Sequence, residues 1–150
     1  MENIKTLEQI KRPWVVAHRG YRGSYPENTL VAFEAAIGVN ADMIELDVSL
    51  TRDRIPVVIH DNTLDRTTNG SGRVSEHTLA ELKELDAGSW FSKKFSGEEI
   101  PTLEELLMSV KGRITVNIEI KPESFESPAI PDGIESQICE LVEKLEMGDS

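Results

Sequence analysis

The stretch that most constrains the fold is residues 43–50, Met-Ile-Glu-Leu-Asp-Val-Ser-Leu. Apolar and polar side chains alternate here, and such alternation over about 4–8 residues is typical of a β-strand. Because successive strand side chains point to opposite faces, Glu45 and Asp47 share the face away from the apolar residues. Buried together they would repel each other, and a divalent cation with its preference for carboxylate oxygens would remove that conflict. The alternative is a surface strand whose acids face water, and this stretch alone leaves both open.

Chain length and charge exclude several functional classes. The chain has 150 residues, enough for one domain with a core of its own, and its net charge of −11 argues against nonspecific binding of nucleic acid. Its apolar runs are far shorter than the roughly 18 residues of a membrane span. The N-terminus lacks the apolar segment of a secretory signal, and Cys139, the one cysteine, cannot form an internal disulfide. These features predict a cytoplasmic protein with no membrane span.

Strand-like and helix-like patterns alternate along the chain. Residues 1–12 indicate a short polar helix or arm. Strands are predicted over 14–17, 43–50, 55–59 and 113–120; helices are predicted over 29–38, from Thr78, over 102–110 and over 134–145. Asn28 is the expected N-cap of the first helix, and Thr78 and Thr102 each open a capping box. Strands that alternate with helices predict parallel β/α units.

Polar residues that can carry chemistry gather where the predicted strands end. In β/α folds the carboxyl-terminal edge of the sheet is where active sites are built. Residues at or near such ends are His18, Glu45, Asp47, His60, Glu119 and Lys121. Four separate strands therefore deliver an acid, a base or an imidazole to one edge, which scattered surface charge would rarely do.

The residue types at this edge suit metal-assisted chemistry on a phosphate. The carboxylates of Glu45, Asp47 and Glu119 favour Mg²⁺ or Ca²⁺ over zinc, although Glu119 could simply pair with a nearby cation. Two histidines, His18 and His60, suit proton transfer near neutral pH, whereas a single strand histidine is more often a satisfied core residue.

The basic residues at the same edge complete this set. Arg19 and Lys121 offer donors to a phosphate; they could also pair with the nearby acids, and both interpretations can hold together. A metal, paired imidazoles and cations suit phosphoryl transfer without a protein nucleophile. His77 lies beside a predicted helix start and is assigned no role.

Eight short motifs follow one another along residues 14–122. They are His18-Arg19-Gly20, Pro26-Glu27-Asn28-Thr29, Glu45-Leu46-Asp47, His60-Asp61, Leu64-Asp65-Arg66-Thr67-Thr68, Leu85-Asp86-Ala87-Gly88, Ile100-Pro101-Thr102-Leu103 and Glu119-Ile120-Lys121. In these motifs, their order and their spacing, the chain resembles the glycerophosphodiester phosphodiesterase family.

The resemblance carries expectations about fold and site. It implies an α/β protein with a TIM-type barrel, of which residues 1–150 form a partial domain, with a small insertion over about 62–100. It implies a divalent cation on Glu45, Asp47 and Glu119. It also implies that His18 and His60 act as general acid and base and that Arg19 and Lys121 bind the phosphate.

Two departures from the family pattern matter. Arg54 stands where the family usually has glycine, which disfavours a tight type I′ turn. A complete barrel needs about 250 residues, so this chain is expected to supply roughly the first half. The strand over 113–120 would then have an open edge, through which the chain could associate with itself.

The expected reaction is hydrolysis of a small-molecule glycerophosphodiester to glycerol 3-phosphate and an alcohol. One histidine would protonate the leaving alkoxide, and the other would activate either water or the glycerol 2-hydroxyl; the sequence leaves these routes open. Two alternatives stay open as well. One is a non-catalytic half-barrel, and the other is a phospholipase D-type lyase that forms a cyclic phosphate. The half-barrel alone is expected to have little diesterase activity.

Overall fold

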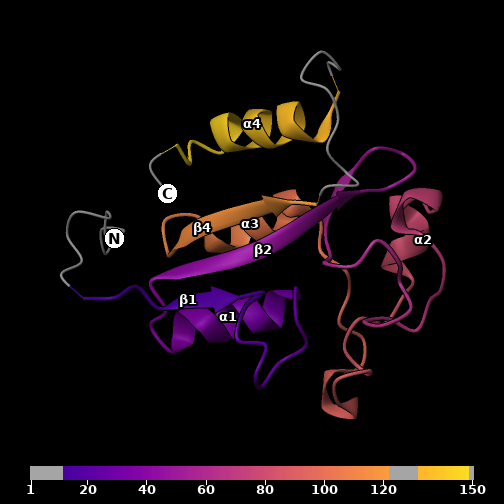
Figure 1. The fold of residues 1–150 in the computed structure, drawn as a ribbon, viewed down its shortest axis with the longest axis horizontal. Coiled ribbons are helices and arrows are strands. Elements are labelled where there is room, and N and C mark those ends of the chain that lie inside the picture. The colour runs from indigo at the N-terminus through magenta and orange to yellow at the C-terminus, as the bar shows by residue number, and fades with distance from the viewer. Residues whose placement is uncertain (1–11, 122–131, 149–150) are drawn as a thin grey trace.

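The computed structural model describes residues 12–121 and 132–148. Figure 1 shows a curved sheet with helices around it, and residues 62–100 at one end of the sheet. In chain order they are β1 (Val16–His18), α1 (Leu30–Gly38), β2 (Met43–Leu50), β3 (Pro56–Val58), the 3₁₀ turn η2 (Val74–Glu76), α2 (Leu79–Lys83), the 3₁₀ turn η3 (Lys93–Phe95), α3 (Leu103–Val110), β4 (Thr115–Ile120) and α4 (Ile134–Lys144). The arm expected over residues 1–12 lies outside the described residues, apart from Arg12.

β2 is the centre of the sheet, and its neighbours do not all run the same way. β1 and β4 pair with β2 in parallel, as predicted. β3 pairs with β2 antiparallel, so the parallel arrangement predicted for strands that alternate with helices does not extend to this pair, which no helix separates. The physical reason is the short connection, because a parallel partner needs a crossover of a dozen or more residues. The turn that makes the hairpin places Arg54 at φ +64°, a left-handed conformation that glycine adopts more readily.

The hydrogen bonds show that β1 and β3 lie along the same edge of β2. The N–H of Arg19 donates to the carbonyl of Glu45 at 2.9 Å, and the N–H of Ile59 donates to the carbonyl of Asp47 at 3.0 Å. Carbonyls two residues apart on a strand point to the same side, so both donors approach from one edge. β4 occupies the opposite edge. The carboxyl-terminal ends of β1 and β3 therefore meet beside the middle of β2.

The main hydrophobic core lies between the sheet and the helices α1, α3 and α4. It contains fully buried side chains of β2 together with helix residues, among them Ile44, Leu46, Val48, Phe33, Leu103, Leu106, Leu107, Val110 and Ile134. Glu45 and Asp47 point to the other face of β2 but are also buried, with relative exposures of 6% and 0%. A half-exposed surface strand, the alternative left open by the sequence, is therefore excluded.

Residues 62–100 have a small core of their own, which packs on β3. Val57 and Ile59 join it from the strand, with Leu64, Val74, Leu82, Ala87 and Ile100 from the segment that follows. Val58 points the other way, into the main core. β3 thus anchors this segment, seen with α2 at the right of Figure 1, to the end of the sheet where β1 finishes.

The helix starts agree with the sequence at two places and differ at a third. Capping boxes form at Thr78 and Thr102, as predicted. The N-cap of α1 is Thr29, whose side chain accepts from the N–H of Ala32, and not Asn28. Asn28 has φ +57° and its amide donates to Asp47, so a contact with the strand takes precedence over capping.

Candidate functional site

Three carboxylates converge where β2 and β4 run side by side. Asp47 and Glu119 are Cα partners in the parallel pairing, and Glu45 lies two residues earlier on β2. One oxygen from each of the three lies within 4.8 Å of the others. Glu45 and Asp47 are buried, whereas the side chain of Glu119 is 50% exposed. The structure thus brings together the three acids that the sequence singled out.

Burial and neighbouring charges act differently on the two buried acids. Burial raises the pKa of Glu45, and the Asp47 charge raises it further, against a lowering hydrogen bond from the N–H of Arg19. Burial also acts to raise the pKa of Asp47, but bonds from Lys121 and Asn28 outweigh it and the net pKa is lowered. The cluster therefore holds negative charge that needs cations beside it.

Lys121 supplies part of that positive charge. Its Nζ lies 2.8 Å from Asp47 Oδ1 and 2.7 Å from Glu119 Oε1, at the end of β4. On the other side, Arg19 Nε lies 3.3 Å from Asp47 Oδ2 and Nη1 donates to Glu27 at 3.1 Å. The ion pairing considered from the sequence is therefore present for both basic residues.

Buried oxygen atoms that accept no hydrogen bond show whether a cation suits the carboxylate cluster. Glu45 Oε1, Asp47 Oδ1 and Asn28 Oδ1 are buried, and among the described residues none accepts a hydrogen bond of good geometry. Lys121 approaches Asp47 Oδ1 as an ion pair off the hydrogen-bonding direction. Buried oxygens of carboxylate and amide are ligands for Mg²⁺ and Ca²⁺, so the residues present fit a hard divalent cation.

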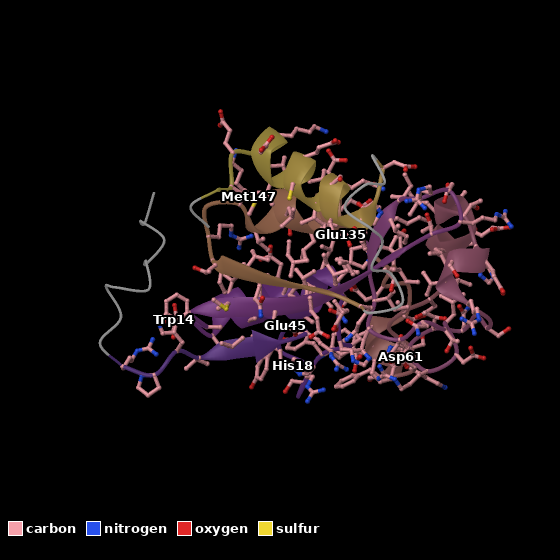
Figure 2. All side chains as sticks on the ribbon, turned by 45° about the horizontal axis from the view of Figure 1, so that its top comes forward. Trp14, His18, Glu45, Asp61, Glu135 and Met147 are labelled. Carbon is pink, nitrogen blue, oxygen red and sulfur yellow. The ribbon has the colours of Figure 1, made fainter. Side chains whose placement is uncertain are left out.

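The two candidate histidines flank this acidic cluster. His18 ends β1, and its Nε2 lies 3.7 Å from Glu45 Oε2. His60 follows β3, and its Nδ1 lies 2.6 Å from Asp61 Oδ1. Figure 2 shows His18 and Glu45 on neighbouring strands, with Asp61 toward residues 62–100. His60 reaches the site because the antiparallel β3 returns to the middle of β2, not because it ends a parallel strand.

The backbone that positions Arg19 and Asn28 is constrained. Both residues have positive φ, +58° and +57°, a conformation that is rare outside glycine and clusters at functional sites. Gly20 follows Arg19 with φ +79°, and a Cβ there would lie 2.8 Å from the backbone of Ala32. The turn after β1 is therefore pressed against α1, which sets the direction of the Arg19 side chain.

Four residues of this region received no role in the site from the sequence. Glu27, Asn28, Asp61 and Arg66 belong to motifs that carried the family resemblance, yet only the folded chain shows what they contact. Arg66 binds both Asp61 and Glu27 through its guanidinium. A separation of 39 residues between Arg66 and Glu27 gives no local pattern from which the pair could be predicted. His77 lies away from this cluster and bonds the carbonyl of Arg73.

Comparison with known proteins gives one consistent family. A family model described as "Glycerophosphoryl diester phosphodiesterase family" matches residues 18–146. The glycerophosphodiester phosphodiesterase of Caldanaerobacter subterraneus subsp. tengcongensis is 49% identical over 131 residues, which are 87% of this chain and 52% of that protein.

Solved structures agree in fold. The glycerophosphodiester phosphodiesterase of Agrobacterium tumefaciens str. C58 superposes with a TM-score of 0.80 at 41% identity, over 91% of this chain and 55% of that one. An Oleispira antarctica phosphodiesterase in complex with the product sn-glycerol-3-phosphate gives 0.78 at 39% identity, over 88% and 52%. The chain therefore has part of a TIM-type barrel, and it spans about half the length of the curated relatives it matches.

Among the described residues, no helix is long and apolar enough to cross a bilayer.

Proposed function

Because the chain belongs to the glycerophosphoryl diester phosphodiesterase family, we propose that it carries the metal-binding and acid–base part of an enzyme that hydrolyses glycerophosphodiesters. The products would be glycerol 3-phosphate and an alcohol. The observation that carries this proposal is the approach of three carboxylates within 4.8 Å beside two histidines and two cations. The likeness to a phosphodiesterase in complex with sn-glycerol-3-phosphate supports the substrate class.

In this proposal Glu45, Asp47 and Glu119 hold a Mg²⁺ or Ca²⁺ ion. When bound, that ion would polarise a phosphate oxygen and neutralise charge that develops on it. Both buried acids have an oxygen to offer, since Glu45 Oε1 accepts no hydrogen bond and Asp47 Oδ1 is approached only by the ammonium of Lys121, as an ion pair.

The protein side chains bind the substrate and move protons. Arg19 and Lys121 are held beside the carboxylates and would turn their donors to the phosphate, whose charge favours both. His18 and His60 would be the acid and base: one protonates the departing alkoxide oxygen, and the other removes a proton from the attacking water or glycerol 2-hydroxyl. Their rings are partly exposed, with side-chain exposures of 46% and 30%, so a substrate can reach them.

The proposal also covers residues 62–100 and the edge of β4 that faces away from β2. We treat 62–100 as an insertion that supports β3 and His60. Within residues 12–121 and 132–148, β4 pairs with β2 alone, and self-association through its other edge stays a proposal.

A cytoplasmic location also stays a prediction; the exposed free thiol of Cys139 suits a reducing compartment.

The test is product analysis with sn-glycero-3-phosphocholine. The protein from the complete natural reading frame is incubated with the diester and Mg²⁺ or Ca²⁺, and the phosphorus products are followed by ³¹P NMR. The diester signal is expected to be replaced by that of glycerol 3-phosphate. A cyclic glycerophosphate that accumulates as the end product would instead identify the lyase alternative, and unchanged diester with every ion would favour the non-catalytic half-barrel. The 150-residue chain alone is expected to be slow, because His18 and Glu119 are half exposed in it.

A further inference from the structure

The contact between His60 and Asp61 defines which ring nitrogen of His60 carries the proton. Nδ1 lies 2.6 Å from Asp61 Oδ1. Hydrogen bonds from Arg66 lower the pKa of Asp61 far below its usual range, so the carboxylate is ionised and can only accept. Nδ1 of His60 must then donate, and in the neutral ring Nε2 keeps a lone pair that can take a proton.

Arg66 holds Asp61 from the opposite side, and four of its five N–H groups donate to carboxylates. Its Nε donates to Asp61 Oδ2 at 2.7 Å and its Nη2 to Asp61 Oδ1 at 2.9 Å. The same guanidinium binds Glu27, with Nη1 at 3.0 Å from Oε2 and Nη2 at 2.8 Å from Oε1. Two carboxylates thus occupy both sides of the planar fork, which leaves Arg66 poorly placed to bind a phosphate.

Glu27 carries the connection on to the acidic cluster. Its side chain is 9% exposed, and its Oε1 also accepts from Arg19 Nη1 at 3.1 Å. Arg19 Nε in turn lies 3.3 Å from Asp47 Oδ2. An unbroken series of charged contacts therefore joins the ring of His60, on the side of residues 62–100, to a carboxylate in the middle of β2.

We propose that Arg66 is a positioning residue: it fixes the tautomer and direction of His60 through Asp61, and it ties that pair to Asp47 through Glu27 and Arg19. A role in catalysis rests on the proposed function, but the hold on the His60 tautomer does not. The competing explanation is a surface ion pair that only stabilises the fold, since the Arg66 side chain is 43% exposed. Such a pair would affect stability and leave the imidazole unchanged.

The imidazole nitrogens can be observed directly by long-range ¹H–¹⁵N correlation spectra of the ¹⁵N-labelled chain, which has three histidines. At a pH where the ring is neutral, wild-type His60 should be predominantly the Nδ1–H tautomer. In Arg66→Ala that predominance should be lost, because Asp61 is free to turn toward water. Arg66→Lys should keep part of it, since an ammonium can hold one carboxylate as a point charge.

Two internal controls separate this effect from a change in fold. Arg113→Ala removes another two-point arginine–carboxylate pair, with Glu34, and its side-chain exposure of 44% matches that of Arg66. It should leave His60 unchanged. His77 Nδ1 lies 2.8 Å from the carbonyl of Arg73 and should stay Nδ1–H in every variant.

Two results would overturn the proposal: an Nε2–H tautomer for His60 in the wild type, or an unchanged Nδ1–H tautomer in a folded Arg66→Ala. If Arg66→Ala loses its native amide spectrum, Arg66→Lys serves as the test instead. A fraction of the Nδ1–H tautomer of His60 equal to that of the wild type in Arg66→Lys would count against the proposal. In an active diesterase, Arg66→Ala should lower kcat about 10–100-fold with KM little changed, as loss of an orienting partner does. A raised KM at unchanged kcat would place Arg66 on the substrate instead.

Discussion

Asp47 on β2 and Glu119 on β4 are direct partners across a parallel pairing, so two acids from strands 72 residues apart reach the same point of the sheet. Glu45 joins them, and the buried Glu45 Oε1 and Asp47 Oδ1 accept no hydrogen bond of good geometry, which predicts binding of a divalent cation. Wild-type protein should be stabilised by Ca²⁺ or Mg²⁺, by about 2.7 kcal/mol at 100 times the dissociation constant. Thermal unfolding with and without the ion measures it.

The matched variants for this prediction are Glu119→Gln and Glu34→Gln, whose parent side chains are 50% and 45% exposed. Glu119→Gln should weaken the protein's affinity for the ion at least tenfold. Loss of a residue that only orients a metal ligand already costs about tenfold or more, and Glu119 would be a direct ligand. Glu34→Gln removes a surface acid that pairs with Arg113 and should not change the affinity. Equal affinities in both variants would show that the ion binds elsewhere.

A second prediction concerns the hydrogen bond from Asn28 to Asp47, 3.0 Å long. Asn28→Gly removes that donor but suits the backbone, because glycine adopts positive φ without strain. Metal affinity should fall about 10–100-fold, since the amide orients Asp47 toward the ion. Asn40→Gly is the control, because Asn40 has the same backbone conformation, φ +59°, and is exposed. An equal effect of both changes on metal affinity in calorimetric titrations would rule out an orienting role for Asn28.

A third prediction concerns the histidines. His18→Ala and His60→Ala should each lower kcat for glycerophosphodiester hydrolysis by about 10²–10⁴-fold, the usual contribution of a general acid or base. Metal affinity should change little, because neither ring belongs to the carboxylate cluster. His77→Ala, which alters the third histidine, should retain full activity. Near-normal turnover by His60→Ala in steady-state assays would remove that residue from the chemistry.

A fourth prediction concerns Asp86, which organises residues 86–97. Its carboxylate accepts hydrogen bonds from Ser89 and from the N–H groups of Gly88 and Gly97, and these lower its pKa well below the ordinary value of 3.8. A group whose pKa is lowered by folding contributes stability above its unfolded pKa and loses that contribution as the pH falls through its folded pKa. This contribution should therefore be complete at neutral pH and should decline below about pH 3.8.

The test is Asp86→Asn, which should reduce the free energy of unfolding by about 1.5–3 kcal/mol at pH 7, the range for hydrogen bonds to a charged group. The difference from wild type should shrink progressively below the ordinary pKa. Asp65→Asn removes an acid that accepts one long bond, 3.2 Å from the N–H of Gly72, and should cost less. Urea denaturation at several pH values would contradict the prediction if the Asp86 difference grew toward acid.

The sequence predicted the parts of the fold that depend on local periodicity. The alternation over residues 43–50 and the capping boxes at Thr78 and Thr102 became β2, α2 and α3. The direction of β3 was not predicted, because alternation is the same in both directions and no helix separates β3 from β2; it is antiparallel. The N-cap of α1 was misplaced by one residue, since Asn28 and Thr29 both favour caps and only the contact with Asp47 separates them.

Of the candidate site, the sequence could identify residues on the polar face of the strands and at strand ends, although Glu45 and Asp47 lie in the middle of β2 and not at its end. Glu45, Asp47 and Glu119 follow from strand pattern and residue type, and the structure brings them together. The support around His60 could not be predicted, because Arg66 and Glu27 meet only when residues 62–100 fold against the turn after β1. Contacts of this kind depend on tertiary structure, and no local pattern encodes them.

We propose that Glu45, Asp47 and Glu119 form one metal site next to a phosphate bound by Arg19 and Lys121. The most direct measurement is a crystal structure with Ca²⁺ and glycerol 3-phosphate, in which the ion is located by anomalous scattering. We expect an ion at about 2.3–2.6 Å from an oxygen of each carboxylate, with Lys121 moved off Asp47 and onto the phosphate. An ion bound elsewhere, with the Lys121 contact to Asp47 at 2.8 Å retained, would contradict it.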